Sequence, residues 1–270
     1  MIFKSEIESI ILNDLKKIIT TESVYQYTKF DIALDEILLK QSLRFSDPLT
    51  FNDPFDCNEK LLKINYDEKL IDETINNLSV KLSRQVKREL KRKFKNRTNQ
   101  SQILKEKRKE YKLSCFSESY SEILMWSHYA DKHSGICVGF NFPHKYDNKF
   151  ILCPVKYLNE LKELDGATDI YRVILYWLTS KSIRWEYEKE IRAISRCKSP
   201  KTDHEYITYD SRYIKEIIFG CNVTDKKIEE AILKIKRSNL DFNNLTIKRM
   251  IINEEDFLLT DRMIKSAHNN

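Results

Sequence analysis

The order of the predicted secondary-structure elements constrains the fold of this 270-residue chain more than any other feature. Apolar spacing predicts strands near 24–28, 42–46, 112–117, 135–140, 151–157, 190–194, 214–220 and 245–248, and helices at 33–40, 126–133, 169–182 and 226–238. Helices and strands mix without a regular strand–helix–strand alternation. This order predicts an α+β fold with a mixed central sheet and flanking helices. Without an internal repeat or low-complexity linker, residues 1–270 are predicted to form a single domain.

Positive charge is concentrated in one segment, 81–112, which begins with Lys81 and ends with Lys112. This segment holds 14 Lys and Arg against 3 Glu, although the whole chain has a net charge of +6. The rest of the chain is therefore acidic. A basic helical insertion over 60–112, containing one long amphipathic helix, is predicted because apolar residues recur every three or four positions at Ile71, Ile75, Leu78, Leu82, Val86, Leu90 and Phe94. Its basic face is either a solvated surface or a binding surface for RNA or DNA.

The composition argues against a membrane protein, because 33% of the residues are charged and the mean hydropathy is −0.54. Residues 1–20 show apolar spacing interrupted by acids, which predicts a helix and not a signal peptide. Six cysteines without a C-x-x-C pair are interpreted as reduced core thiols. Together these features predict a cytoplasmic protein that does not bind membranes.

The segment 125–140 combines one Trp, two of the five His and two of the four Gly. It reads as a short helix that leads into a buried strand, with Gly135 and Gly139 allowing close packing. His128 and His133 are either structural or ligand contacts. A zinc site with Cys115 and Cys137 is disfavoured, since the two histidines are five residues apart and would point to different sides of a helix.

The loop at 47–56 is rich in Pro, Asn and Asp, so it is predicted to be rigid and to present side chains. Arg44 and Ser46 precede it and Phe55 lies within it. Aromatic residues near this region either form core or line a pocket that stacks on a planar ring; they are Tyr25, Tyr27, Phe45, Phe55, Trp126, Tyr129 and Tyr187.

Three carboxylates, Glu186, Glu188 and Glu190, alternate along the chain and would share one face of an extended segment. Their mutual repulsion would raise proton affinity unless Arg184, Lys189 or Arg192 lay nearby, and this could prepare one of them for catalysis. A solvated strand edge is the alternative. With Asp53 or Asp56, the same carboxylates could instead hold Mg²⁺ in a nuclease.

The usual phosphate-loop, dinucleotide and serine-hydrolase motifs are absent from the sequence. Cysteine nucleophile chemistry with Cys115 or Cys137 stays open, although spacing gives it no support.

Five separated motifs between residues 24 and 220 resemble a widespread bacterial family of domains of unknown function, number 2971 of that series. They are Val24-Tyr-Gln-Tyr27, the pair Leu43-Arg-Phe-Ser-Asp-Pro and Phe51-Asn-Asp-Pro-Phe-Asp, Ser114-Cys-Phe-Ser-Glu, Trp126-Ser-His-Tyr-Ala-Asp-Lys-His-Ser-Gly, and Trp185-Glu-Tyr-Glu-Lys-Glu-Ile-Arg. This resemblance by itself implies no activity.

The order of Tyr27, the helix at 33–40, Phe116-Ser117 and Glu188-x-Glu190 also resembles ADP-ribosyltransferase-like domains. The chain departs from that pattern, because a tyrosine replaces the usual His or Arg of the first strand and the Ser-Thr-Ser triplet is only Ser114-Cys-Phe-Ser117. The resemblance implies an NAD-dependent enzyme with NAD as its substrate and no required metal. It implies Glu190 and Glu188 as catalytic residues and a cofactor-binding set of Tyr27, Arg44, Ser46, Phe55, Ser117, Trp126, His128, Tyr129 and His133.

The leading hypothesis is therefore an ADP-ribosyltransferase-like enzyme that modifies a nucleic acid or a protein, in a bacterial defence or toxin setting. Its predicted partners are NAD or a related nucleotide and RNA or DNA at the basic segment. The alternatives are a non-catalytic nucleic-acid or ligand-binding module and a Mg²⁺-dependent nuclease.

Overall fold

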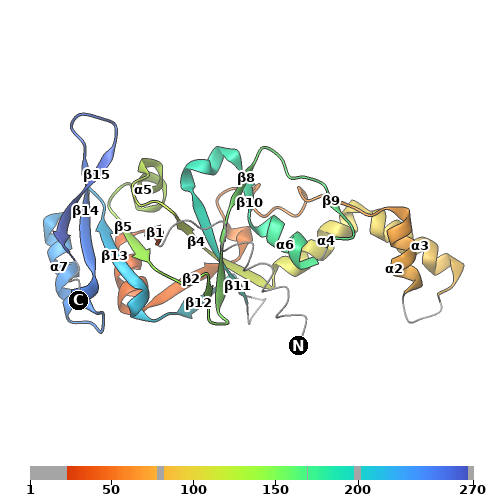
Figure 1. Ribbon diagram of the computed structural model, residues 1–270, viewed down its shortest axis with the longest axis horizontal. Helices are drawn as coiled ribbons and strands as arrows, with labels where there is room; N and C mark the ends of the chain where they lie inside the picture. Colours follow the sequence, from red (N-terminus) through yellow and green to blue (C-terminus); the bar gives the residue numbers. More distant parts are fainter. Residues whose placement is uncertain (1–22, 78–81, 169, 198–201, 267–270) are drawn as a thin grey trace.

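The computed structural model describes residues 23–77, 82–168, 170–197 and 202–266 (Figure 1). These residues form an 11-stranded mixed sheet with helices around it, which confirms the predicted α+β class. The helix predicted at 1–20, and Leu78 and Lys81 of the basic segment, lie outside the described residues. None of the helices in the described part of the chain is both long enough and apolar enough to cross a membrane.

Nine strands follow one another across the main sheet. In spatial order they are β15 (Leu259–Lys265), β14 (Thr246–Ile252), β13 (Ile214–Phe219), β5 (Ile136–Phe140), β1 (Val24–Thr28), β4 (Tyr111–Ser117), β11 (Glu190–Arg196), β7 (Phe150–Pro154) and β6 (Lys145–Tyr146). The strands β2 (Ser42–Ser46) and β12 (His204–Thr208) branch from this path. Only β13 and β14 pair in parallel; the other pairs of this sheet are antiparallel.

Two small parallel pairs stand apart from the main sheet. They are β8 (Lys156–Leu158) with β10 (Ser180–Ser182), and β3 (Ile64–Asn65) with β9 (Leu164–Asp165). The helices are α2 (Glu68–Asn76), α3 (Arg84–Lys95), α4 (Arg97–Arg108), α5 (Ile123–Tyr129), α6 (Ile170–Leu178) and α7 (Asp225–Lys236). Short 3₁₀ segments are η2 (Pro48–Thr50), η3 (Ile183–Glu188), η4 (Ser211–Tyr213) and η5 (Phe242–Asn244).

The main sheet forks along β4. Ser117 at the end of β4 pairs with Tyr25 of β1, whereas Leu113 near its start pairs with Ser46 of β2. The strands β1 and β2 therefore leave β4 at different points. Between them the chain runs through η1 (Ile32–Leu39), a helix with π-type hydrogen bonding whose apolar side is buried in the core. The fork opens the sheet at the place where several predicted site residues lie.

Helices bury apolar stripes against both ends of the sheet. Ile228, Ala231 and Ile235 of α7 join the largest buried cluster, together with residues of β5 and β13. Trp177 of α6 belongs to a second cluster that includes Ile194 of β11. In Figure 1, α7 lies at one end of the long axis, while α2 and α3 lie at the other end, beyond the sheet.

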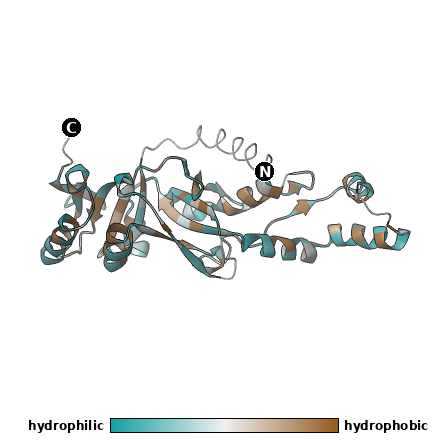
Figure 2. Cartoon of the chain, turned by 90° about the horizontal axis from the view of Figure 1, so that it is seen from below, coloured by the Kyte–Doolittle hydropathy of each residue, from teal (hydrophilic) through white to brown (hydrophobic). Residues whose placement is uncertain are grey.

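The prediction of one long amphipathic helix in the basic segment is wrong. The structure has α2, which ends at the C-cap Asn77, and a separate α3, whose first turn is capped by the Ser83 hydroxyl accepting from the Val86 N–H. Hydrophobic and hydrophilic residues alternate along the helices at this end of the chain (Figure 2), so apolar residues recur at the same spacing on both sides of the break. Only Ile71 and Ile75 of α2 are buried, and α3 buries no residue.

Three predicted elements end earlier than expected. The helix predicted at 126–133 begins at Ile123 but ends at Tyr129, and Asp131, Lys132 and His133 have positive φ angles of 49°, 54° and 67°. The strand predicted at 151–157 divides after Pro154, because a proline cannot donate to the ladder and the Val155 and Lys156 amides turn to Glu190 and Thr179. The helix predicted at 169–182 ends at Leu178, and Ser180–Ser182 instead form β10 beside β8. Because Ser180–Ser182 form a strand in place of the last helical turn, Lys181 lies next to the fork.

Candidate functional site

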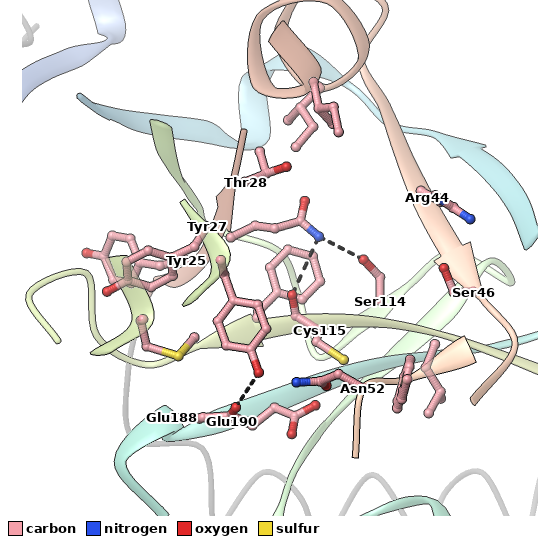
Figure 3. A pocket seen from close by; sticks show the side chains of 18 of the residues that line it. Tyr25, Tyr27, Thr28, Arg44, Ser46, Asn52, Ser114, Cys115, Glu188 and Glu190 are labelled. Atoms are coloured by element: carbon pink, nitrogen blue, oxygen red, sulfur yellow. Dashed lines mark hydrogen bonds between the residues drawn. The ribbon is translucent and has the colours of Figure 1, made fainter. Parts of the chain in front are cut away.

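A pocket of about 520 Å³ lies in the fork between β1 and β2, with β4 as its floor. We call it the fork pocket; its volume is within the range of small-molecule sites. Figure 3 shows Tyr25 and Tyr27 on one side, Arg44 and Ser46 on the other, and the two glutamates at one end. Its lining residues are Tyr25–Thr28, Ile32, Glu36, Ile37, Ser42, Arg44, Ser46, Phe51, Asn52, Asp56, Leu113–Phe116, Met125, Tyr129, Lys181, Glu188, Glu190 and Tyr206.

Six of the residues predicted from sequence share this lining although they come from distant parts of the chain. They are Tyr27, Arg44, Ser46, Tyr129, Glu188 and Glu190. Tyr27 comes from β1, Arg44 and Ser46 from β2, and Tyr129 from α5. The fold therefore brings six of the eleven predicted site residues into one cavity, and the roles of these residues remain predictions.

Tyr27 lines the pocket with a largely buried ring. Its hydroxyl donates to the Ser119 carbonyl over 2.8 Å, and its ring meets Trp126 edge-on at 5.2 Å. Trp126 is fully buried, and its indole N–H donates to the Tyr120 carbonyl at 2.7 Å. Trp126 thus supports Tyr27 from behind and does not line the pocket.

Ser117 also supports the site from outside the pocket. It is fully buried, and its Oγ donates to the Glu188 carbonyl over 2.7 Å and accepts from the Ser119 amide at 3.1 Å. Since Ser117 pairs with both Tyr25 and Glu190, it fixes the position of β11 relative to β1. Its hydroxyl is therefore placed to hold the end of η3.

The remaining three predicted residues do not reach the fork pocket. Phe55 is 65% exposed, and His128 is exposed beside Tyr187. His133 lines a second cavity of about 430 Å³ beneath the β14–β15 hairpin, in which Phe257 is almost fully exposed. The two histidines and Cys115 thus lie in separate places, and Cys137, the fourth member of the zinc arrangement considered above, is buried in β5.

Glu188 and Glu190 meet at Lys181. The Lys181 ammonium contacts Glu188 Oε2 and lies 2.9 Å from Glu190 Oε2. The Tyr129 hydroxyl donates to Glu188 Oε1 over 2.7 Å. Both glutamates are almost completely buried, so this lysine is the main cation that offsets the charge of Glu188.

Glu190 has a second cation, Arg192, which is fully buried. Arg192 donates to both oxygens of Glu190, at 2.8 and 3.1 Å, and to Asp56 Oδ1 at 3.0 Å. Its Nη1 also donates to the Leu178 carbonyl at 2.8 Å. Glu190 therefore accepts two charge-assisted hydrogen bonds from one guanidinium group, whereas Glu188 accepts none from Arg192.

The two glutamates have opposite pKa shifts. Burial alone would raise the pKa of Glu190, but the charges of Arg192 and Lys181 outweigh it and lower that pKa to about 2. Burial raises the pKa of Glu188 above 4.5, and Lys181 only partly offsets this effect. Such a pair, with one firmly ionised and one more basic carboxylate, is common at catalytic sites.

These shifts predict how stability depends on pH. Because folding lowers the pKa of Glu190 from 4.5, its stabilising contribution is present above that value and is lost as the pH falls towards about 2. A Glu190→Gln variant should therefore show a flatter fall in the free energy of unfolding over this range. Urea denaturation at pH 5, 4 and 3, compared with the wild type, checks this. An equally steep fall in the variant would contradict it.

The expectation that Glu186, Glu188 and Glu190 share one extended face is wrong. Residues 183–188 form the 3₁₀ segment η3, and Lys189 adopts a left-handed conformation with φ of 45° before β11 begins at Glu190. Glu186 is exposed on the outside of η3. Glu188 and Glu190 still meet, because the turn at Lys189 folds them towards Lys181 and not because they alternate along a strand.

Several residues of the pocket were not predicted from sequence. No sequence feature indicated Lys181, because apolar spacing predicted it at the end of the helix at 169–182. Gln26 donates to Ser114 Oγ at 3.0 Å, and within the described chain its buried Oε1 has no hydrogen-bond partner. Asn52 hydrogen bonds Tyr129 from the loop at 47–56, where the cluster of turn residues could have indicated it.

Cys115 lies on the pocket floor near Glu190 (Figure 3). Although Cys115 is partly exposed to solvent, desolvation by the surrounding protein and the neighbouring Glu190 charge raise the pKa of its thiol well above 9.0. A protonated thiol is a poor nucleophile, so this position argues against cysteine catalysis. Cys137 is buried within β5, and burial raises the pKa of its thiol as well.

Residues 125–193 match the model of a family described as "Protein of unknown function (DUF2971)". This match confirms the predicted resemblance to that domain-of-unknown-function family over a segment that includes the Trp126 block and the motif beginning at Trp185. The predicted motifs before residue 125 lie outside the matched segment. No curated protein and no solved structure matches the chain. What the fork pocket does must therefore be inferred from its chemistry.

Proposed function

We propose that the fork pocket binds NAD or a related nucleotide and cleaves the bond between nicotinamide and ribose, as in ADP-ribosyltransferase-like enzymes. The observation that carries this proposal is the convergence of Tyr27, Tyr129, Arg44 and both glutamates on one cavity. The resemblance to ADP-ribosyltransferase-like domains implies these same residues as the site. An aromatic wall, an exposed arginine and buried carboxylates provide stacking, phosphate binding and negative charge.

The chemistry requires negative charge at one point of the pocket. When the glycosidic C–N bond breaks, nicotinamide leaves with the bonding electron pair and the ribose carbon becomes positively charged. Water or an acceptor hydroxyl or amine then attacks that carbon and loses a proton. A preorganised carboxylate stabilises the positive charge in a site that excludes water.

Within this proposal Glu188 has the leading role, although the resemblance favoured Glu190. The charge of Glu190 is satisfied by Arg192 and Lys181, whereas Glu188 has Lys181 and the Tyr129 hydroxyl. Glu188 is therefore the carboxylate with more charge left to offer a substrate. Glu190 positions Lys181, and so orients Glu188.

A Mg²⁺-dependent nuclease is less well supported. Asp56, Glu188 and Glu190 do gather in the pocket, but the cations around them are Arg192 and Lys181. Among the described residues no group of three or more His, Cys, Asp and Glu side chains is arranged to hold a metal ion. A nuclease would need these two cations to move away from the carboxylates.

Incubation of the full chain with millimolar NAD tests the proposal. We expect free nicotinamide to accumulate in proportion to the protein, and ADP-ribose to inhibit its release. Chromatography of the products and titration of NAD binding provide the two measurements. Saturable binding without nicotinamide release would favour a ligand-binding module. Absence of both binding and release would refute the proposal.

A further inference from the structure

We propose that Arg84, Arg88 and Arg92, a row on the outer face of α3, bind the phosphates of a nucleic acid. All three are exposed, and no acidic side chain of the described residues pairs with them. This proposal does not depend on the chemistry of the fork pocket. It assigns a partner to the part of the chain farthest from α7 (Figure 1).

The spacing of the row suits a repeating anion. Residues four apart on a helix lie about 6 Å apart along its axis and close to one face, so three guanidinium groups follow one line. Each guanidinium can form two parallel hydrogen bonds with a phosphate. A row of this kind can contact successive phosphates of one strand.

The lysines of α3, unlike the arginines, have partners on α2 or on α3 itself, where Lys93 lies 3.4 Å from Glu89. Lys91 pairs with Asp72, and Lys95 lies 2.6 Å from Glu68. Lys87 donates to Asn76 at 2.8 Å. These contacts link α3 to α2, and among the described residues of α3 they leave the arginine row without an acidic partner.

An apolar partner does not fit this face. Val86 is the one large apolar side chain of α3 that is exposed, at 41%, while Leu90 and Phe94 are half-buried. Phe94 packs against Tyr66 with ring centroids 5.5 Å apart. The arginine row itself carries charge and no apolar side chain, so this face suits a hydrated polyanion and not a membrane interior or a hydrophobic groove.

The arginine row and the fork pocket can be tested separately. None of the residues lining the pocket belongs to α2, α3 or α4. A variant with Arg84, Arg88 and Arg92 each changed to Gln should keep its NAD binding. The chain outside 81–112 carries a net negative charge, so the positive charge of the protein is concentrated in this segment.

The experiment measures the binding of the full chain to a labelled single-stranded RNA and to a duplex DNA, each about 20 nucleotides long, as salt is raised from about 50 to 200 mM. The triple Arg→Gln variant should bind at least about tenfold more weakly at low salt. The slope of log affinity against log salt should fall by about 2 to 3, which corresponds to three lost phosphate contacts.

The matched control removes three exposed cations at the other end of the molecule, with Lys226, Lys234 and Arg237 each changed to Gln. It makes the same change in net charge and should bind nearly as well as the wild type. Equal weakening in both variants, unchanged binding in the arginine variant, or wild-type binding only to phosphatidylserine vesicles and not to either nucleic acid would overturn the proposal.

Discussion

Replacing Glu188 with Gln is expected to lower nicotinamide release by at least about 100-fold. Gln has nearly the same shape as Glu but carries no charge, and removing one preorganised electrostatic contact commonly costs 10²- to 10³-fold in rate. Lys181 keeps Glu190 and Asp56 as partners in this variant. The rate of nicotinamide release at saturating NAD is the measurement.

Stability separates a catalytic role of Glu188 from a structural one. Because burial raises the pKa of Glu188, its charge is a cost to the folded state, and the neutral Gln should leave the free energy of unfolding at pH 7 unchanged or raise it. Glu186→Gln is the matched control, since Glu186 is exposed two residues away and should keep full activity. If Glu188→Gln keeps its rate while a folded Glu190→Gln loses it, the leading role belongs to Glu190.

Individual strands and helices were predictable because the apolar spacing that indicates each of them lies within a few consecutive residues. The strands at 24–28 and 42–46 and the helix at 226–238 follow directly from apolar spacing. The α+β class followed from the order of the elements. The break between α2 and α3 was missed, since a stripe with the same period continues on both sides of it and only Ser83 marks the cap.

The residues of the site were predictable only in part, because several of them are brought together by contacts between distant parts of the chain. Tyr27 and Glu190 belong to motifs, so a resemblance could identify them. Lys181 has no motif, and its position depends on β10 pairing with β8 after α6 ends early. The division between Glu188 and Glu190 depends on which carboxylate Arg192 reaches, and this is a property of the packed core. Such contacts between distant residues leave no pattern in one sequence.

Replacing Arg192 with Met is expected to lower the free energy of unfolding by about 3–5 kcal/mol. Arg192 is fully buried and bridges Asp56 and Glu190, so its loss leaves two buried carboxylates with Lys181 as their remaining cation. Urea denaturation at pH 7 measures the change. The exposed Arg184, changed to Met in the same way, should alter stability by less than about 0.5 kcal/mol.

A compensating variant distinguishes lost charge balance from lost packing around Arg192. When a whole buried ion set is made neutral, stability is commonly recovered, because the cost lies in the unpaired charges. Adding Asp56→Asn and Glu190→Gln to Arg192→Met should therefore restore most of the lost free energy. If the triple variant is as unstable as Arg192→Met alone, the guanidinium acts mainly by filling space under the pocket. In that case Glu188 would owe its position to packing of the core and not to the charges that meet at Lys181.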